Sequence, residues 1–114
     1  CMARIDSLKA KIAKLAAKGK LDGLIKYASD PDDSVRTEVA IAMGRIATYE
    51  CGMALIPLLR DPSPMVRSAA ATSAADIQAK HCEEYVKKLA FADSDPEVRN
   101  IAKAAFDRLK TNVV

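Results

Sequence analysis

The residues best suited to chemistry are His81, Cys82 and Glu83, which follow one another in the sequence, together with Cys51. Imidazole, thiolate and carboxylate groups all bind zinc, and a structural zinc site needs four ligands that converge at about 2.0–2.3 Å. A Cys-His pair could alternatively supply a nucleophile and its base, provided that a third group orients the base. Whether zinc binding or nucleophilic chemistry is possible depends on the secondary-structure elements that position these residues.

Three related copies of one segment organise the chain. They read DPDDSVR (residues 30–36), DPSPMVR (61–67) and DSDPEVR (93–99), so the Val-Arg pairs are 31 and then 32 residues apart. Self-similarity at such a period is typical of stacked repeats in which each unit is one supersecondary element. The Ala- and Leu-rich composition favours helix. We therefore predict an all-α fold, a right-handed α-solenoid of stacked antiparallel helix pairs.

The length sets the number of units. With 114 residues, half of them apolar, the chain suffices for one domain with a core and is too short for two. We divide this domain into an N-terminal capping helix (1–20), repeat 1 (21–50), repeat 2 (51–81) and repeat 3 with a C-terminal tail (82–114). The first helix lacks the Val-Arg motif, and solenoids need a cap because the end unit would otherwise expose its packing face.

Each unit is predicted to contain a short first helix, a tight turn and a longer second helix. The first helices cover about 21–29, 53–60 and 83–92, with Ile25 inward and Pro57 near a helix start, and the second helices cover about 33–48, 64–79 and 96–110. In each second helix, the motif valine and the residues 4, 7, 8 and 11 positions after it share one helix face. The three helices together have fifteen such residues, and fourteen of them are apolar. The predicted core positions are Val35, Val39, Ala42, Met43 and Ile46, then Val66, Ala70, Ser73, Ala74 and Ile77, then Val98, Ala102, Ala105, Phe106 and Leu109.

This architecture separates the residues that could do chemistry. Cys51 and Cys82 occupy equivalent positions of neighbouring units, whose helices should pack roughly 8–10 Å apart, whereas a disulfide needs Cα atoms within about 7 Å. The sequence has one histidine and four glycines, and it contains neither a Ser-His-Asp set nor a Gly-rich phosphate loop. We predict no catalytic residue, no metal and no cofactor. The odd number of cysteines favours a reducing compartment, so we expect a cytoplasmic location.

The N-terminal helix is strongly basic. It has no continuous apolar block, so we expect no secretory signal, and no run in the chain approaches the roughly 18 to 20 apolar residues that cross a bilayer. We also expect the natural chain to start at Met2, after an added Cys1. The six basic residues among the first twenty are Arg4, Lys9, Lys11, Lys14, Lys18 and Lys20.

At these motifs the sequence resembles the HEAT-like repeat family, including its short repeats of the phycobilisome bilin-lyase type. The shared features are LIPLL in a first helix (residues 55–59), the Asp-Pro turn, and Val-Arg followed by an Ala- and Leu-rich helix, over about residues 21–110. The resemblance implies a HEAT/armadillo-like superhelix, and a bilin-lyase-type accessory role only through the family name. The paired His-Glu steps of the family's di-iron enzymes are missing.

The resemblance also implies a ladder of polar contacts between neighbouring units, formed by the turn aspartate and the arginine that follows the motif valine. We expect a structural role for these arginines, since a long stem can pack at the edge of the core while the head reaches a turn. In the third unit Asp95 competes with Asp93 for this role. The residues carried over are Asp30 with Arg36, Asp61 with Arg67, and Asp93 with Arg99.

A partner-binding surface is predicted on the outer face of the second helices. Of the twelve residues at offsets 2, 6, 9 and 13 from the motif valine, one is charged, against 29 % of the whole chain. Either curvature crowds this side and favours small residues, or the face is a shallow trough for a partner's apolar helix or peptide. The second interpretation predicts that replacing Ala71 and Ala75 with Glu abolishes partner capture without lowering thermal stability. The residues assigned to the trough are Ala40, Ile41, Ala71, Thr72 and Ala75.

Together these features predict a non-catalytic protein–protein interaction scaffold, with a protein or peptide as its partner and no contact with membranes. The alternative is a nucleic-acid-binding protein that uses the basic N-terminal helix. Against it, the second-helix face is neutral and no aromatic residue is placed for stacking on bases. Self-association through the end faces also stays open, because these faces are a large part of so short a stack.

Overall fold

The computed structural model describes residues 2–111, and the side chains of residues 4–110. In this range the chain is all helical, without a strand, and no helix is long and apolar enough to cross a membrane. The elements in order are α1 (Met2–Ala17), α2 (Leu21–Tyr27), α3 (Asp33–Met43), α4 (Tyr49–Leu59), α5 (Pro64–Asp76), the 3₁₀ turn η1 (Lys80–Cys82), α6 (Glu83–Ala92) and α7 (Pro96–Thr111).

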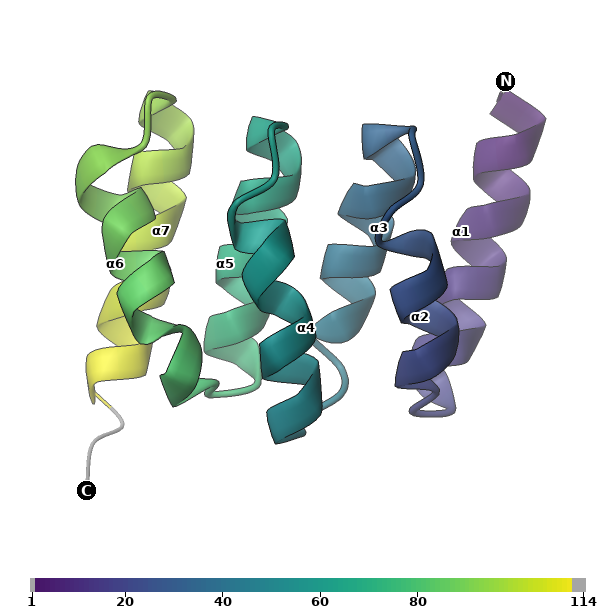
Figure 1. Cartoon of the computed structure of the whole chain (residues 1–114), viewed down its shortest axis with the longest axis horizontal. Coiled ribbons are helices and arrows are strands. Elements are labelled where there is room, and N and C mark those ends of the chain that lie inside the picture. The colour runs from purple at the N-terminus through teal and green to yellow at the C-terminus, as the bar shows by residue number, and fades with distance from the viewer. Residues whose placement is uncertain (1, 112–114) are drawn as a thin grey trace.

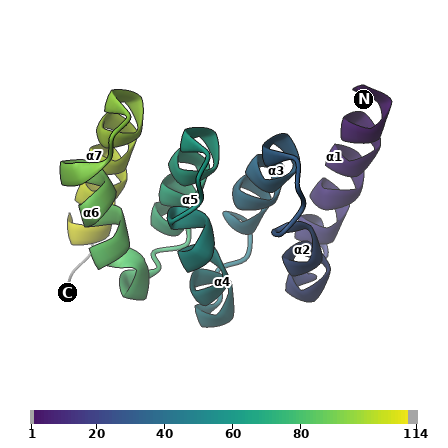
Figure 2. The ribbon, with the colours of Figure 1, turned by 45° about the horizontal axis from the view of Figure 1, so that its top comes forward.

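The helices form two layers that run the length of the molecule (Figures 1 and 2). One layer holds α1, α3, α5 and α7 in that order, with α3 packed on α5 and α5 packed on α7. The other holds α2, α4 and α6, each against the second helix of its own unit. This arrangement confirms the predicted α-solenoid of helix pairs. Helix α1 packs on α3 and so occupies a second-helix position.

The turns within the units share one local structure. The carboxylates of Asp30, Asp61 and Asp93 each accept the backbone N–H two residues further on, at 2.9 Å. The first N–H groups of a helix lack partners inside the helix, so a side chain that accepts them, or a proline that has no N–H, suits the helix start. Asp32 and Asp95 accept such N–H groups, and Pro64 occupies the start of α5. Helix α1 instead ends before Gly19, whose φ of +67° favours glycine.

One continuous core runs from Ile12 of α1 to Leu109 of α7. The motif valines Val35, Val66 and Val98 are all buried in it, as predicted. Alanines fill much of the space around the second helices, because a small side chain lets neighbouring helix backbones approach closely. The buried alanines of α3, α5 and α7 are Ala40, Ala42, Ala70, Ala71, Ala74, Ala75, Ala102 and Ala105.

Some predicted helix bounds and the placement of two residues were wrong in detail. Helix α3 ends at Met43 and α4 already begins at Tyr49, because the Thr48 side chain accepts the Cys51 N–H and caps α4. Pro57 therefore lies near the end of α4, not near its start. Ile25 is exposed, because α2 is a short helix that buries the face centred on its neighbour Leu24.

Candidate functional site

The predicted ladder is present, but Arg36 and Arg67 each reach forward to the aspartate of the next unit. Arg36 donates from Nε and Nη2 to the two carboxylate oxygens of Asp61, at 2.8 and 3.0 Å. Arg67 makes the same two bonds to Asp93, at 2.8 and 2.9 Å. Such a bidentate pair is both stronger and more directional than a single hydrogen bond.

The aspartate of an arginine's own unit takes part through its backbone. Arg36 donates to the carbonyl of Asp30, Arg67 to that of Asp61, and Arg99 to that of Asp93. The pairing that the resemblance implies, between the aspartate and the arginine of the same unit, therefore corresponds to the backbone contact. The carboxylate contact links neighbouring units. In the third turn Asp93 is the ladder residue, while Asp95 caps α7.

Arg4 begins the ladder, although sequence reasoning missed it. Its Nη2 donates to the Asp30 carboxylate at 2.7 Å. The two residues are 26 apart, as are Arg67 and Asp93, while Arg36 and Asp61 are 25 apart. This recurring separation is the signal that could have identified α1 as a modified second helix.

The ladder shifts the pKa of the internal aspartates. Burial alone would raise the pKa of Asp61 and of Asp93, but hydrogen bonds from an arginine and from a backbone N–H outweigh it, so that both pKa values lie below the usual 3.8. A carboxylate whose pKa is lower in the folded than in the unfolded state stabilises the fold above the unfolded pKa. That contribution is lost as the pH falls through the folded pKa.

The residues best suited to chemistry are engaged in packing. The Cys51 thiol donates to the carbonyl of Met43 and the Cys82 thiol to that of Gly52, both at 3.2 Å. Burial raises the pKa of both thiols to about 11, and for Cys82 the neighbouring Cys51 adds to the rise. At neutral pH such thiols carry little of the thiolate that attacks substrates or binds metals. Within the described part of the chain no three His, Cys, Asp or Glu side chains are grouped to hold a metal ion.

His81 lies against the first turn of α4. Its ring stacks on Tyr49, with centroids 4.3 Å apart, and its Nε2 lies 3.1 Å from the Tyr49 carbonyl oxygen. This position requires a glycine at Gly52, because a Cβ there would lie 2.1 Å from His81 Nε2.

We expect Gly52→Ala to displace the His81 ring and to lower the free energy of unfolding by about 1–2 kcal/mol, the usual cost of an extra methyl group in a packed site. Urea unfolding measures this change. In a His81→Ala background the two closest atoms are removed and only the Ala79 Cβ, 3.1 Å from the added methyl group, remains close, so the same substitution should cost clearly less. An equal cost in both backgrounds would contradict the contact.

The predicted partner-binding residues divide into two groups. Ile41 and Thr72 are exposed, whereas Ala40, Ala71 and Ala75 are fully buried at 0 % exposure and cannot contact a partner. The assignment of these three alanines to a surface trough is therefore corrected. The reason is that α3 and α5 each have a neighbour on both sides within their layer, as well as a first helix packed against them, so only a narrow strip of their surface remains open.

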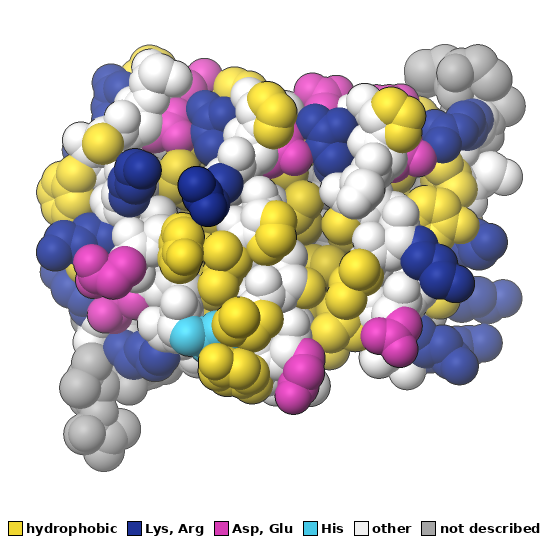
Figure 3. Space-filling model, in the orientation of Figure 1, with side chains coloured by type: hydrophobic (Ala, Val, Ile, Leu, Met, Phe, Trp, Pro, Cys, Tyr) yellow, Lys and Arg dark blue, Asp and Glu magenta, His cyan; other side chains and the backbone are white. Residues whose placement is uncertain are grey.

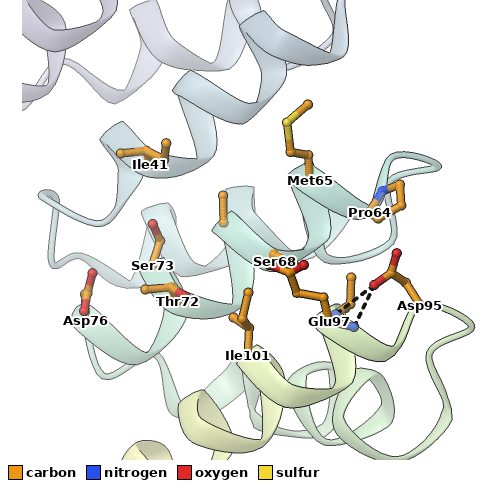
Figure 4. A pocket seen from close by; sticks show the side chains of 12 residues that line it. Ile41, Pro64, Met65, Ser68, Thr72, Ser73, Asp76, Asp95, Glu97 and Ile101 are labelled. Carbon is orange, nitrogen blue, oxygen red and sulfur yellow. Dashed lines mark hydrogen bonds between the residues drawn. The ribbon is translucent and has the colours of Figure 1, made fainter.

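A groove does exist on this face, next to the predicted position. It has a volume of about 560 Å³ and lies between α5 and its neighbours α3 and α7. Figure 4 shows that Ile41 of α3 and Ile101 of α7 lie on opposite sides of Thr72 and Ser68 of α5. We call it the second-helix groove. Its lining residues are Ile41, Pro64, Met65, Ser68, Ala69, Thr72, Ser73, Asp76, Asp95, Glu97, Val98 and Ile101.

The second-helix groove is apolar inside and acidic at its rim. Ile41 and Met65 are about half exposed, at 52 % and 50 %. Asp76, Asp95 and Glu97 contribute the only charged side chains among the described lining residues. Of these, Asp76 is paired with Arg108, which does not line the groove. Sequence reasoning missed Met65 and Ile101, because their offsets of −1 and 3 from the motif valine fall outside the positions assigned to the outer face.

The face formed by the first helices α2, α4 and α6, which we call the first-helix face, differs from the face formed by the second helices. Figure 3 shows hydrophobic side chains gathered over α4 next to the histidine, and Tyr49 and Met53 are exposed there. A larger hollow of about 810 Å³ lies between α4 and α6. Its lining mixes Arg60, Lys88 and Glu84 with the Arg67–Asp93 ion pair, so it favours no one kind of ligand.

The fold and this groove define a class of protein, the helical-repeat solenoids, which present a surface assembled from side chains of successive units. A family model described as HEAT repeats matches residues 21–107, which is most of the chain. The chain belongs to the HEAT repeat family. HEAT repeats generally serve as protein-interaction scaffolds. Comparison with curated proteins finds no match to the chain.

Proposed function

We propose that the protein is a non-catalytic scaffold that binds a partner protein in its second-helix groove. The partner segment would be a peptide or helix with apolar side chains flanked by lysine or arginine. The observation that carries this proposal is the composition of the groove, with exposed Ile41 and Met65 between carboxylates and with no basic side chain among its described lining residues.

Both halves of that composition contribute to recognition. An exposed Ile or Met side chain that becomes buried against a partner contributes on the order of 1 kcal/mol, since about half of its surface leaves water. The Asp76 carboxylate is already paired with Arg108, at 2.8 Å. The carboxylates of Asp95 and Glu97 add little affinity from the rim, but they select basic over acidic partners and speed the encounter. An amphipathic helix laid in a groove is a common form of peptide recognition, with anchors on one of its faces.

We expect Ile41→Asp to reduce retention of the native partner at least tenfold, because it places a charge where an apolar anchor should bury. Met53→Asp is the matched control, since Met53 is similarly exposed on the first-helix face. Both variants should unfold within about 0.5 kcal/mol of the parent, as surface substitutions usually do. Pull-downs from native lysate with quantitative mass spectrometry identify the partner as the protein that Met53→Asp keeps and Ile41→Asp loses. A partner that both variants retain equally would refute the groove.

The basic face of α1 supports an alternative function, binding to nucleic acid. Lys9, Lys11, Lys14, Lys18 and Lys20 are all exposed, while Arg4 is paired with Asp30. Binding to generic duplex that weakens steeply with salt would favour this function. The absence of binding at low salt would remove it. A bilin-lyase-type accessory role rests on the resemblance of the repeats alone.

A further inference from the structure

The C-terminal end of the ladder has a cation without the carboxylate that its counterparts bind. Arg4, Arg36 and Arg67 each donate to the aspartate of the following unit. Arg99 occupies the equivalent position of α7 and donates to the carbonyl of Asp93, but no carboxylate of the described residues pairs with it. In Figure 1 the α6–α7 pair is the last in the stack, so this side of α7 faces no further helix of the described chain.

Aromatic and basic side chains follow Arg99 along the same face of α7. Lys103, Phe106 and Lys110 follow it at spacings of four, three and four residues, which places all four on one face of α7. The Phe91 ring meets the edge of Phe106 at a centroid distance of 6.3 Å, and Lys110 Nζ lies 5.3 Å from the Phe106 centroid. Phe91 is 66 % exposed, more than any other large hydrophobic side chain described. We call Phe91, Arg99, Lys103, Phe106 and Lys110 the C-terminal end face.

The internal units indicate which group suits Arg99. In both internal pairs the arginine presents Nε and Nη2 to the two oxygens of one carboxylate, at 2.8–3.0 Å. The backbone contact that orients those guanidinium groups is present at Arg99 as well, since its Nη1 also donates to the carbonyl of its own turn aspartate. The Arg99 guanidinium therefore has the same backbone contact as its counterparts, and no carboxylate of the described residues pairs with it.

A further repeat unit or a second copy of this chain fits the C-terminal end face poorly. Lys103 stands where α3 and α5 have Ala40 and Ala71, which are fully buried and allow close packing of the next helix. A long charged side chain at that position keeps a similar helix at a distance. Head-to-tail stacking would also bring the lysines of α1 against Lys103 and Lys110, and like charges repel.

We propose that the C-terminal end face binds an acidic segment of a second partner protein. One Asp or Glu of that segment pairs with Arg99 in the bidentate geometry of the internal ladder. Apolar side chains of the segment cover Phe91 and Phe106, while further carboxylates lie near Lys103. This surface is separate from the second-helix groove, and the two surfaces select partners of opposite charge.

The probe is a synthetic peptide of repeated Leu-Glu-Glu units, and its control is the same peptide with Gln in place of every Glu. Calorimetry measures affinity, and ¹⁵N NMR of arginine side chains follows the Nε–Hε signal of Arg99. We expect the acidic peptide to bind and to shift that signal. Arg99→Ala should weaken binding about tenfold, as the loss of a charge-assisted bidentate pair does. Arg99→Lys should weaken it nearly as much, because an ammonium cannot form the fork.

Lys9→Ala is the matched control, since it removes an exposed cation at the opposite end of the stack and should leave binding unchanged. Equal affinity for the Gln peptide, or for the Arg99→Ala and Arg99→Lys variants, would overturn the proposal. So would a dimer that Phe91→Ala disrupts, or single-stranded DNA that displaces the acidic peptide. None of these variants changes a residue of the second-helix groove. A negative result at the C-terminal end face would therefore not count against the proposed function.

Discussion

Ala71→Glu is expected to lower the free energy of unfolding by at least about 4 kcal/mol, enough to unfold a domain of ordinary stability. Ala71 is fully buried in α5, within the layer of second helices. A glutamate there either overpacks a close helix contact or carries a carboxylate into the core without a partner. Urea unfolding followed by circular dichroism measures the change.

Thr72→Glu is the matched control for this prediction. It introduces the same side chain one residue further along α5, at an exposed position, and should change stability by less than about 0.5 kcal/mol. If Ala71→Glu folded as stably as Thr72→Glu, the second helices would not pack as closely as described. The prediction from the sequence, that Ala71→Glu does not lower stability, would then be correct.

Asp61→Ala is expected to cost about 3 kcal/mol, which is typical when one partner of a buried ion pair is removed. The substitution leaves the Arg36 guanidinium, whose side chain is 15 % exposed, without its carboxylate. It also leaves the Ser63 N–H without the acceptor that ends the turn. Equilibrium unfolding in urea gives the loss directly.

The chain offers a control at the same position of another turn. Asp30→Ala removes an aspartate with the same bond to the backbone N–H two residues on, but its ion-pair partner Arg4 is half exposed. An exposed pair contributes little because water screens it, so this variant should lose about 1 kcal/mol. Equal losses from both substitutions would show that the buried pair between units adds nothing beyond the turn itself.

The same aspartate should make stability sensitive to acid. Because its pKa is lower in the folded state, Asp61 stabilises the fold above pH 3.8, and that contribution disappears as the pH falls below this value. The stability of the parent should therefore drop more steeply below about pH 4 than that of Asp61→Ala. Parallel pH profiles for the two proteins would contradict the lowered pKa.

The fold could be predicted from the sequence because the three Val-Arg copies repeat their surroundings as well as their own residues. Each copy has an aspartate that ends one helix, a helix start, and an apolar face that begins at Val35, Val66 or Val98. These local preferences agree with one another, and the helix pairs they specify can stack in one way only along the chain.

The details of the candidate site were harder to predict, because they depend on contacts between units. A helical wheel treats a helix as having one buried and one exposed side, whereas α5 has neighbours on three sides. Ala71 and Ala75 therefore lie inside the stack, and the open strip consists of other positions, such as Met65 and Thr72. The forward reach of Arg36 to Asp61 likewise depends on how far apart neighbouring units lie, which no local pattern encodes.

Methyl NMR with a basic amphipathic probe shows directly whether the second-helix groove binds such a segment. The protein is labelled at the Ile δ1 and Met ε methyl groups and titrated with a synthetic helix of Leu and Lys. We expect the signals of Ile41, Met65 and Ile101 to shift together, while those of Ile25 and Met53 on the first helices stay in place. Shifts confined to Ile25 and Met53, or no shift in the groove at saturation, would contradict this expectation.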